Sequence, residues 1–383
     1  MSSNFKPLSF PLDNKEHDAI VEWWYFNGHL TDKNGNCYAF MDCLFKADLK
    51  RIDAPSFLKR IPFRKKIVGD NPYYYFAHSV VSDIANQKNY KDVQNYSLIS
   101  RDSFKRPLLF VNYASPNIFG GYVNNEIAEK SPSAADLQAR PFNFHIKTEN
   151  LDLELESKKP PLLESGKGFI SVCGRESYYY SLTDLRAKGV LNIENRIIEV
   201  EGKAWFDHQW TDVSKMEKWS WFSLQLENGT DIMCAEYDDG KNKAYLVDLI
   251  YSDGKQEHFN KLLLTPGKDV WKSKKTKAEY PLSFTIEIPE KNIKFEVIST
   301  MSDQEMIYGS INYWEGPLDV TGTMGGHAER AQSHAQRGGE KIKGMGFMEL
   351  VGYPSDYSFL FLSAKDLGAK INETISAKLK RNK

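Results

Sequence analysis

The sequence predicts an all-β protein built from two antiparallel barrel or sandwich domains. Aromatic residues make up 13% of the 383 residues, with 20 Tyr and 8 Trp, and such residues favour strands and line pockets. Turn sequences such as Asn228-Gly229 and Asp253-Gly254 recur at short intervals between β-branched and aromatic segments. A long run of strands without helical periodicity between them is typical of sandwiches and barrels.

Short segments of strand-forming residues between these turns predict the strands in chain order. The predicted strands cover Glu22–Leu30, Cys37–Phe45, Tyr73–Val81, Phe142–Leu155, Tyr178–Leu182, Ile197–Phe206, Ser220–Leu226, Asp231–Tyr237, Ala244–Tyr251, Phe284–Ile288, Lys294–Ile298, Ile311–Val320 and Gly346–Tyr353. Three stretches break the pattern. They read as a basic insertion or lid over Arg51–Lys66, a mobile loop over Gly325–Gly344 and a polar C-terminal helix over Leu367–Lys383.

The length of 383 residues predicts two domains, at about 100–200 residues each. We place the boundary near Val200–Asp212, which gives an N-terminal domain over 1–205 and a C-terminal domain over 206–383.

Composition and motifs exclude several function classes. The formal net charge of −1 argues against a nucleic-acid partner. The four cysteines form no CxxC pair, so we expect no zinc site and no other metal. The sequence has no phosphate loop, Rossmann glycine fingerprint, Gly-x-Ser-x-Gly elbow or His-Glu-x-x-His motif, so we expect no cofactor and no serine-hydrolase chemistry.

The N-terminal residues show no apolar run after a basic region, and no stretch approaches the ~20 apolar residues of a membrane helix. We therefore expect a cytoplasmic protein with reduced thiols. The basic segments are either solvated surface or a site of transient contact with a membrane surface.

The segment Arg196–Trp210 reads as a strand with two distinct faces. With a period of two, His208 and Trp210 continue the apolar face, whereas Asp207 points to the opposite face. Asp207 and His208 are therefore not expected to form a dyad. His208 either lines a cavity or is a core histidine that a backbone carbonyl satisfies.

Two further segments hold candidate acids. Tyr237 and Asp239 share one face of the strand that begins at Asp231, although Asp238-Asp239-Gly240 is also an ordinary turn sequence. Glu22 shares a face with Trp24 and Phe26. Burial among aromatics would raise the pKa of the Glu22 carboxyl and make it a proton donor, unless Glu22 is a structural residue paired with an Arg. His78 likewise has either a functional or a structural role.

Six blocks resemble one known family. They are Glu-Trp-Trp-Tyr-Phe at 22–26, Phe-Ala-His-Ser at 76–79, Tyr-Tyr-Tyr-Ser at 178–181, Ala-Trp-Phe-Asp-His-Gln-Trp at 204–210, Tyr-Trp-Glu-Gly at 313–316 and Gly-Phe-Met-Glu-Leu-Val-Gly-Tyr at 346–353. Together they resemble the carotenoid 1,2-hydratase (hydroxyneurosporene synthase) and AttH-like family. The resemblance implies two lipocalin-like β-barrel domains and an apolar, often isoprenoid, ligand.

The resemblance also implies site residues. A His-x-Trp pair and a later Tyr-x-Asp pair of the hydratases match His208 with Trp210, and Tyr237 with Asp239. In this interpretation Asp239 is the acid, with Asp207 or Glu22 as substitutes. The expected substrate-binding residues are Glu22, Trp24, Phe26, His78, Trp221 and Trp314.

Three functions fit these residues. The first is an enzyme that protonates an isoprenoid C=C bond to a tertiary cation, followed by water capture (a hydratase) or ring closure (a terpene cyclase). The second is a carrier of a lipid or terpenoid without turnover. The third is a scaffold whose barrels are filled.

Overall fold

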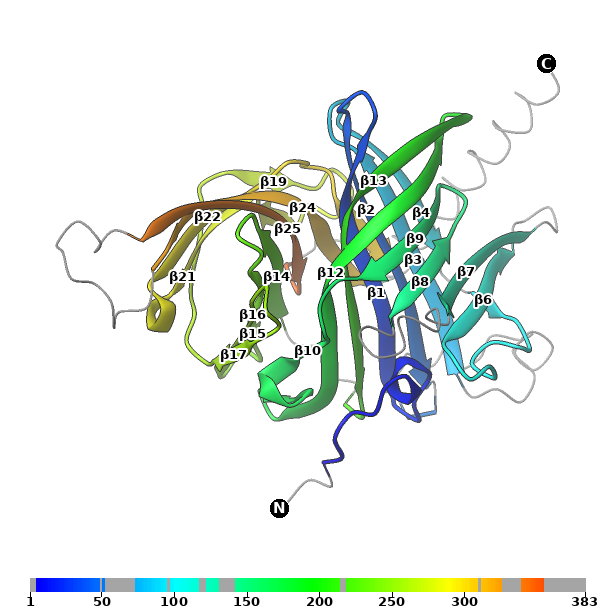
Figure 1. Cartoon of the computed structure of the whole chain (residues 1–383), viewed down its shortest axis with the longest axis horizontal. Coiled ribbons are helices and arrows are strands. Elements are labelled where there is room, and N and C mark those ends of the chain that lie inside the picture. Colours follow the sequence, from blue (N-terminus) through cyan, green and yellow to red (C-terminus); the bar gives the residue numbers. More distant parts are fainter. Residues whose placement is uncertain are drawn as a thin grey trace.

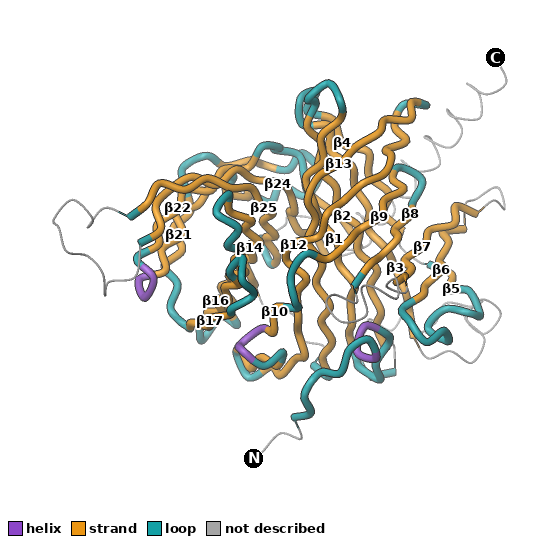
Figure 2. Tube along the Cα trace, viewed as in Figure 1, coloured by secondary structure: helices purple, strands orange, loops and turns teal. Residues whose placement is uncertain are grey.

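The computed structural model consists of two strongly curled antiparallel sheets that stand side by side (Figure 1). It describes residues 5–48, 50–51, 73–94, 97–116, 122–130, 142–213, 218–308, 311–325 and 339–354. Within these ranges the only helices are three short 3-10 turns, η1 (Leu12–Asn14), η3 (Glu164–Gly166) and η4 (Pro289–Lys291) (Figure 2). No helix of this part of the chain is long and apolar enough to span a bilayer. The predicted all-β class is confirmed.

The first sheet has the spatial order β4-β3-β2-β1-β13-β12-β9-β8-β7-β6-β5, and β10 and β11 also pair with β12. Its strands are β1 (Val21–Asp32), β2 (Cys37–Asp48), β3 (Tyr73–Asp83), β4 (Lys88–Gln94), β5 (Leu98–Ile99), β6 (Phe110–Pro116), β7 (Tyr122–Lys130), β8 (Asn143–Lys147), β9 (Leu151–Ser157), β10 (Leu162–Leu163), β11 (Phe169–Val172), β12 (Arg175–Ile193) and β13 (Arg196–Thr211).

The second sheet has the order β17-β16-β15-β14-β25-β24-β22-β21-β18, and β23 also pairs with β24. Its strands are β14 (Lys218–Leu226), β15 (Asp231–Asp238), β16 (Lys243–Ile250), β17 (Gln256–Phe259), β18 (Leu263–Pro266), β21 (Ser283–Ile288), β22 (Ile293–Ser299), β23 (Glu305–Tyr308), β24 (Ile311–Met324) and β25 (Glu340–Val351). A separate hairpin pairs β19 (Val270–Lys272) with β20 (Glu279–Pro281).

Most predicted strands are present, and the differences have local causes. The single strand predicted over Phe142–Leu155 is wrong, because a tight turn at Thr148 separates β8 from β9. In this turn the Thr148 N–H donates to the Leu151 carbonyl. The predicted strands do not include β4 to β7, β10, β11, β17 to β20 or β23. The predicted Gly325–Gly344 loop is partly wrong, since β25 begins at Glu340 and pairs with β24.

Two other predicted segments lie mainly outside the described residues. These are the C-terminal helix over Leu367–Lys383 and residues 52–66 of the predicted insertion. Residues 326–338 of the predicted loop are also outside them.

The chain passes from the first sheet to the second between Thr211 and Lys218. A division after Trp205 would cut β13, which pairs with β1 through Thr211. The first sheet therefore ends a few residues later than the predicted N-terminal domain, because the apolar alternation of β13 continues through Trp210.

Buried apolar side chains form three clusters. One fills the inside of the first sheet and includes Trp24, Phe26 and Phe206. A second fills the inside of the second sheet and includes Trp314. The third lies between the two sheets, where β1 contacts β25 and β12 contacts β14 and β15. We call this third set the inter-sheet cluster. It comprises Tyr25, Ala39, Met41, Cys43, Val80, Leu162, Ile170, Val172, Tyr179, Trp205, Trp221, Met233, Ala235, Tyr237, Leu246, Ile250, Met306, Tyr313, Phe347 and Val351.

Candidate functional site

Strands β1 and β13 separate the inside of the first sheet from the space between the sheets. Successive side chains of a strand point to opposite faces. In the β1–β13 register Trp24 lies opposite His208, and Tyr25 lies opposite Asp207. His208 therefore faces the first core and Asp207 faces the second sheet. The two side chains share no hydrogen-bond partner among the described residues, in keeping with the prediction that they do not form a dyad.

Inside the first sheet, Glu22 is the centre of a buried charged group that we call the His208 cluster (His17, Glu22, Lys46, Tyr180 and His208). Glu22 Oε1 lies 2.8 Å from His17 Nδ1 and 3.0 Å from His208 Nε2. Its Oε2 accepts from Lys46 Nζ at 2.8 Å. Tyr180 OH lies 3.3 Å from the other ring nitrogen of His208.

These contacts decide the charges of the cluster. Burial alone would raise the pKa of Glu22, but hydrogen bonds from His17 and His208 hold this pKa at about 2. Burial lowers the pKa of His208 to about 4, so this ring is neutral at pH 7. The interpretation of Glu22 as a proton donor is therefore wrong, because an ionised carboxylate with three donors around it has no proton to give.

Aromatic rings enclose the His208 cluster. The Trp210 ring stacks on His17 with centroids 3.7 Å apart and an interplanar angle of 3°. The Trp24 ring stacks on His208 at 5.0 Å, and its Nε1 donates to the Asn14 carbonyl at 2.9 Å. His208 and Trp210 thus belong to one packed unit, as strand alternation predicts.

The same cluster holds the described group of side chains most suited to a metal ion. One donor atom each of His17, Glu22 and His208 lies within 4.8 Å of the others. However, the Lys46 ammonium already balances the Glu22 charge, and a cation would have to displace it. The donor set therefore fits a buried ion pair better than a resident metal.

On the opposite face, Asp207 is bound within the inter-sheet cluster. It accepts from Trp205 Nε1, Tyr179 OH and Ser181 Oγ, each at 2.6 Å. The Tyr179 hydroxyl in turn accepts from Trp221 Nε1 at 2.9 Å, which links the two sheets. Burial raises the pKa of Asp207 to about 6 despite these bonds.

A second pair of carboxyls faces the same space from the second sheet. Glu315 on β24 and Glu349 on β25 are direct cross-strand neighbours. Glu315 is buried, whereas Glu349 is half-buried and accepts from Trp219 Nε1 at 2.8 Å. Burial, with added repulsion from Asp207, raises the pKa of Glu349 to about 7. Burial and the nearby Glu349 charge hold the pKa of Glu315 well above its usual value.

The structure does not bring the four predicted catalytic residues together. His208 and Trp210 lie inside the first sheet, but Tyr237 belongs to the inter-sheet cluster. Asp239 lies beyond the end of β15, where its Oδ1 accepts the backbone N–H groups of Lys241 and Asn242 at 2.8 and 2.7 Å. Of the two predicted interpretations of Asp239, this geometry matches the turn.

The predicted substrate-binding residues also divide among the three clusters. Glu22, Trp24 and Phe26 face the first core. Trp314 faces the second core and donates to the Ser302 carbonyl. Trp221 and His78 lie between the sheets, where a His78 ring nitrogen lies 2.5 Å from the Tyr313 hydroxyl.

Sequence reasoning missed His17, Glu315 and Glu349. The latter two occur inside the quoted blocks Tyr-Trp-Glu-Gly and Gly-Phe-Met-Glu. Alternation would have placed Glu315 on the face of Tyr313, but only the pairing of β24 with β25 makes the two glutamates neighbours. His17 precedes the first strand, so no periodicity indicates its position.

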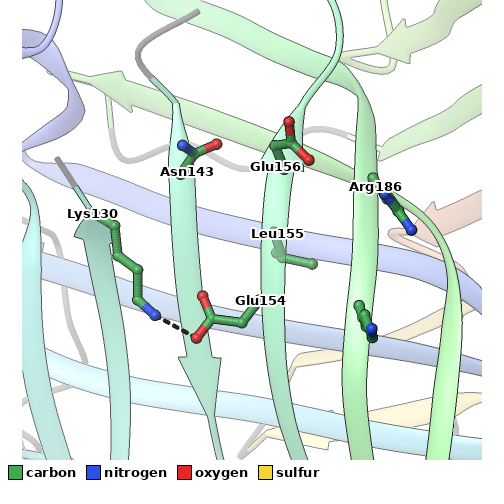
Figure 3. Close-up of a pocket in the computed structure, with 7 residues that line it drawn as sticks. Lys130, Asn143, Glu154, Leu155, Glu156 and Arg186 are labelled. Carbon is green, nitrogen blue, oxygen red and sulfur yellow. Dashed lines mark hydrogen bonds and ion pairs between the residues drawn. The ribbon is translucent and has the colours of Figure 1, made fainter. Parts of the chain in front are cut away.

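A polar hollow lies on the outer surface of the first sheet (Figure 3). It has a volume of about 400 Å³, and an ion pair between Lys130 and Glu154 crosses it. Its other lining residues are Asn143, Leu155, Glu156, Arg186 and Lys188. Such a charged lining does not suit the apolar ligand that the sequence predicts.

Comparison with known proteins gives relatives named for water addition or removal. The chain is 23% identical over 163 residues to the dehydratase asqC of Emericella nidulans, a match that covers 40% of this chain and 47% of that protein. The chain thus matches about half the length of this curated relative.

Two crystal structures share the fold. A protein assigned as AttH from Nitrosomonas europaea superposes with a TM-score of 0.65 at 24% identity, covering 92% of this chain and 98% of that one. Kievitone hydratase from Nectria haematococca superposes with a TM-score of 0.60 at 14% identity, covering 91% and 94%. The family model described as AttH-like matches residues 2–353, nearly the whole described fold. This protein belongs to the AttH-like family.

Proposed function

We propose that this protein is a hydro-lyase that adds water to, or removes water from, a carbon–carbon double bond of an apolar ligand bound against the inter-sheet cluster. The single observation that carries the proposal is the pair Glu315 and Glu349. These carboxyls lie side by side, face aromatic side chains and have raised pKa values.

Two adjacent carboxyls shielded from bulk water favour one shared proton, because two negative charges in close contact repel each other. The pKa of Glu315, which is held well above its usual value, keeps a proton on the pair at neutral pH, and Glu349, with a pKa of about 7, can exchange a proton with a substrate. In hydration, the proton adds to one alkene carbon and a cation forms at the other. Water then attacks the cation, and the proton lost from that water returns to the pair.

The aromatic surroundings suit such a cation. Tyr25 and Tyr313 lie within the inter-sheet cluster, and Trp219 packs against it. A desolvated aromatic face stabilises a cation by about 0.5–2 kcal/mol. An isoprenoid alkene, which protonates to a tertiary cation, is the substrate class that we propose.

In this proposal the acid is the Glu315–Glu349 pair in place of Asp239, whose carboxylate is committed to a turn. His208 and Trp210 lie on the opposite face of β13, where their packing keeps β1 and β13 rigid. Asp207, whose pKa burial raises to about 6, is mostly ionised at neutral pH, and its charge helps to hold a proton on Glu349. The names of kievitone hydratase and the dehydratase asqC support a reaction of this type.

The test is product analysis by mass spectrometry in ¹⁸O-labelled water with acyclic carotenoid and shorter prenyl substrates. We expect one ¹⁸O per product for the wild type and a rate loss of about 100-fold or more for Glu349→Gln and Glu315→Gln. Glu199→Gln, at an exposed position of β13, is the matched control and should keep the wild-type rate.

Three results would count against the proposal. Binding of these substrates without any new product would instead support a carrier. Full turnover by both glutamine variants would place the acid elsewhere. A cyclised product without ¹⁸O would overturn the hydration step while keeping the cation.

A further inference from the structure

The short turn η3 brings a serine of the first half of the chain to an acid and a histidine of the second half. η3 follows β10 of the first sheet and contacts β16 and β17 of the second. Ser165 lies in this turn, Asp248 lies on β16 and His258 lies on β17. Asp248 and His258 are cross-strand neighbours within the second sheet, and the packing of the two sheets brings Ser165 to them.

The distances match a nucleophile, a base and an orienting acid. Ser165 Oγ lies 3.3 Å from His258 Nε2, and His258 Nδ1 lies 3.0 Å from Asp248 Oδ1. Next to a carboxylate, Nδ1 carries the ring proton and donates it, which leaves Nε2 free to accept from the serine hydroxyl. Such contacts are often longer in unliganded sites than during the reaction.

The backbone at Ser165 is unusual for its residue type. Its φ of 59° and ψ of 24° lie in the left-handed region, which a non-glycine residue seldom adopts. A second bond fixes this conformation, because the Ser165 N–H donates to Asp248 Oδ2 at 3.1 Å. The turn therefore holds the hydroxyl in a strained position, as is common at functional sites.

The site is reachable from solvent. His258 and Ser165 are half-buried, and the adjoining Gly166 is exposed. A Cβ added to Gly166 would meet only the Cβ of His258, at 3.9 Å, so the space beside the imidazole is open. Asp248 by contrast is buried beneath the histidine, where it can orient the ring without contact with water.

We propose that Ser165, His258 and Asp248 form a triad that hydrolyses small carboxylic esters. This activity is separate from the hydro-lyase reaction proposed above. The residues occur in the chain order Ser, Asp, His without a Gly-x-Ser-x-Gly motif, which is why the sequence argued against serine-hydrolase chemistry. A triad is recognised by geometry and roles, because the same constellation occurs on unrelated folds.

The reaction balances with water as the co-reactant. Ser165 Oγ attacks the ester carbonyl carbon while its proton passes to His258 Nε2. The tetrahedral intermediate collapses, the C–O bond to the alcohol breaks, and Nε2 returns the proton to the leaving oxygen. Water, deprotonated by His258, then attacks the acyl-serine, and the acid departs as Ser165 regains its proton.

The charges nearby are compatible with this cycle. Burial, with the neighbouring Asp248 charge, raises the pKa of Glu164 well above its usual value. A neutral Glu164 leaves the negative charge on Asp248, where it stabilises the imidazolium formed during attack. The hydrogen bond that His258 donates to Asp248 raises the pKa of His258 and makes the ring a stronger base.

The experiment uses the full chain with p-nitrophenyl acetate and an alkyl fluorophosphonate probe. We expect ester hydrolysis, and one phosphonyl group located on Ser165 by peptide mass spectrometry. Ser165→Gly suits the left-handed backbone, and with His258→Gln it should lower both rates by about 100-fold or more. Ser171→Ala, at an exposed serine of β11, is the control and should keep both.

Each outcome decides the proposal. Labelling at another residue, or a Ser165→Gly variant that hydrolyses the ester at the wild-type rate, would overturn it. Thermal unfolding of each variant is measured alongside. A folded Ser165→Gly protein that has lost labelling supports the triad over a role in holding the sheets together.

Discussion

Replacing Glu22 by Gln removes the negative charge of the His208 cluster while keeping the shape of the side chain. The pKa of Glu22 is about 2 in the folded protein against 4.5 as its ordinary value. At about 1.4 kcal/mol per pKa unit, this fall corresponds to about 3 kcal/mol of stability at neutral pH. Loss of one partner from a buried ion pair, here Lys46 Nζ at 2.8 Å, costs a similar ~3–5 kcal/mol.

The sign of the pH dependence follows from the depressed pKa. Stability from Glu22 is fully present above its unfolded pKa and is lost as pH falls toward about 2. We therefore expect Glu22→Gln to lower the free energy of unfolding by about 3 kcal/mol at pH 7 and to flatten the acid limb of the stability curve.

Urea unfolding followed by tryptophan fluorescence, from pH 7 to pH 3, measures both effects. Glu129→Gln is the matched control, because burial raises the pKa of the Glu129 carboxyl and its oxygens accept from two neutral donors, the Asn14 amide and the Leu109 N–H. It should cost no more than about 1 kcal/mol. A Glu22→Gln protein within about 0.5 kcal/mol of the wild type at pH 7 would refute the charge assignment.

Three other substitutions test separate features. Burial raises the pKa of Asp42 from 3.8 to about 7, so its contribution to stability is present below the unfolded pKa and is lost as pH rises through 7. Between pH 5 and 8 this loss is on the order of 3 kcal/mol, and Asp42→Asn should remove it when urea unfolding is compared at these two pH values. Lys159→Met breaks the buried 2.6 Å pair with Asp231 and should lower the unfolding free energy by about 3–5 kcal/mol, with unchanged stability as the contrary result. Gly202→Ala would place a Cβ 1.9 Å from the His29 carbonyl oxygen and should cost about 3 kcal/mol or more, seen as a lower Tm in calorimetry.

Strand alternation predicted much of the fold because each face of β1 and β13 has a distinct environment. His208 and Trp210 were correctly assigned to one face and Asp207 to the other. The turn after β15 could also be predicted from the sequence, since Asp239 and Gly240 have the residue types that a turn requires.

The sites were harder to predict because they depend on pairing between distant strands. Glu315 and Glu349 become neighbours only when β24 pairs with β25, and no local pattern gives that register. Ser165 meets His258 only when the two sheets pack together. The family motifs placed His208 and Tyr237 in one site, but His208 on β13 faces the inside of the first sheet, whereas Tyr237 on β15 belongs to the inter-sheet cluster.

The wall formed by β1 and β13 has a consequence for insertions and deletions. One residue added to β13 before Asp207 would change the parity of every later position. The Asp207 carboxylate would then face the ionised Glu22. The His208 ring would move away from Lys46 and His17 and would face the carboxyls of the second sheet. Between Trp205 and Trp210 the number of residues should therefore be more strictly preserved than the identity of any single one.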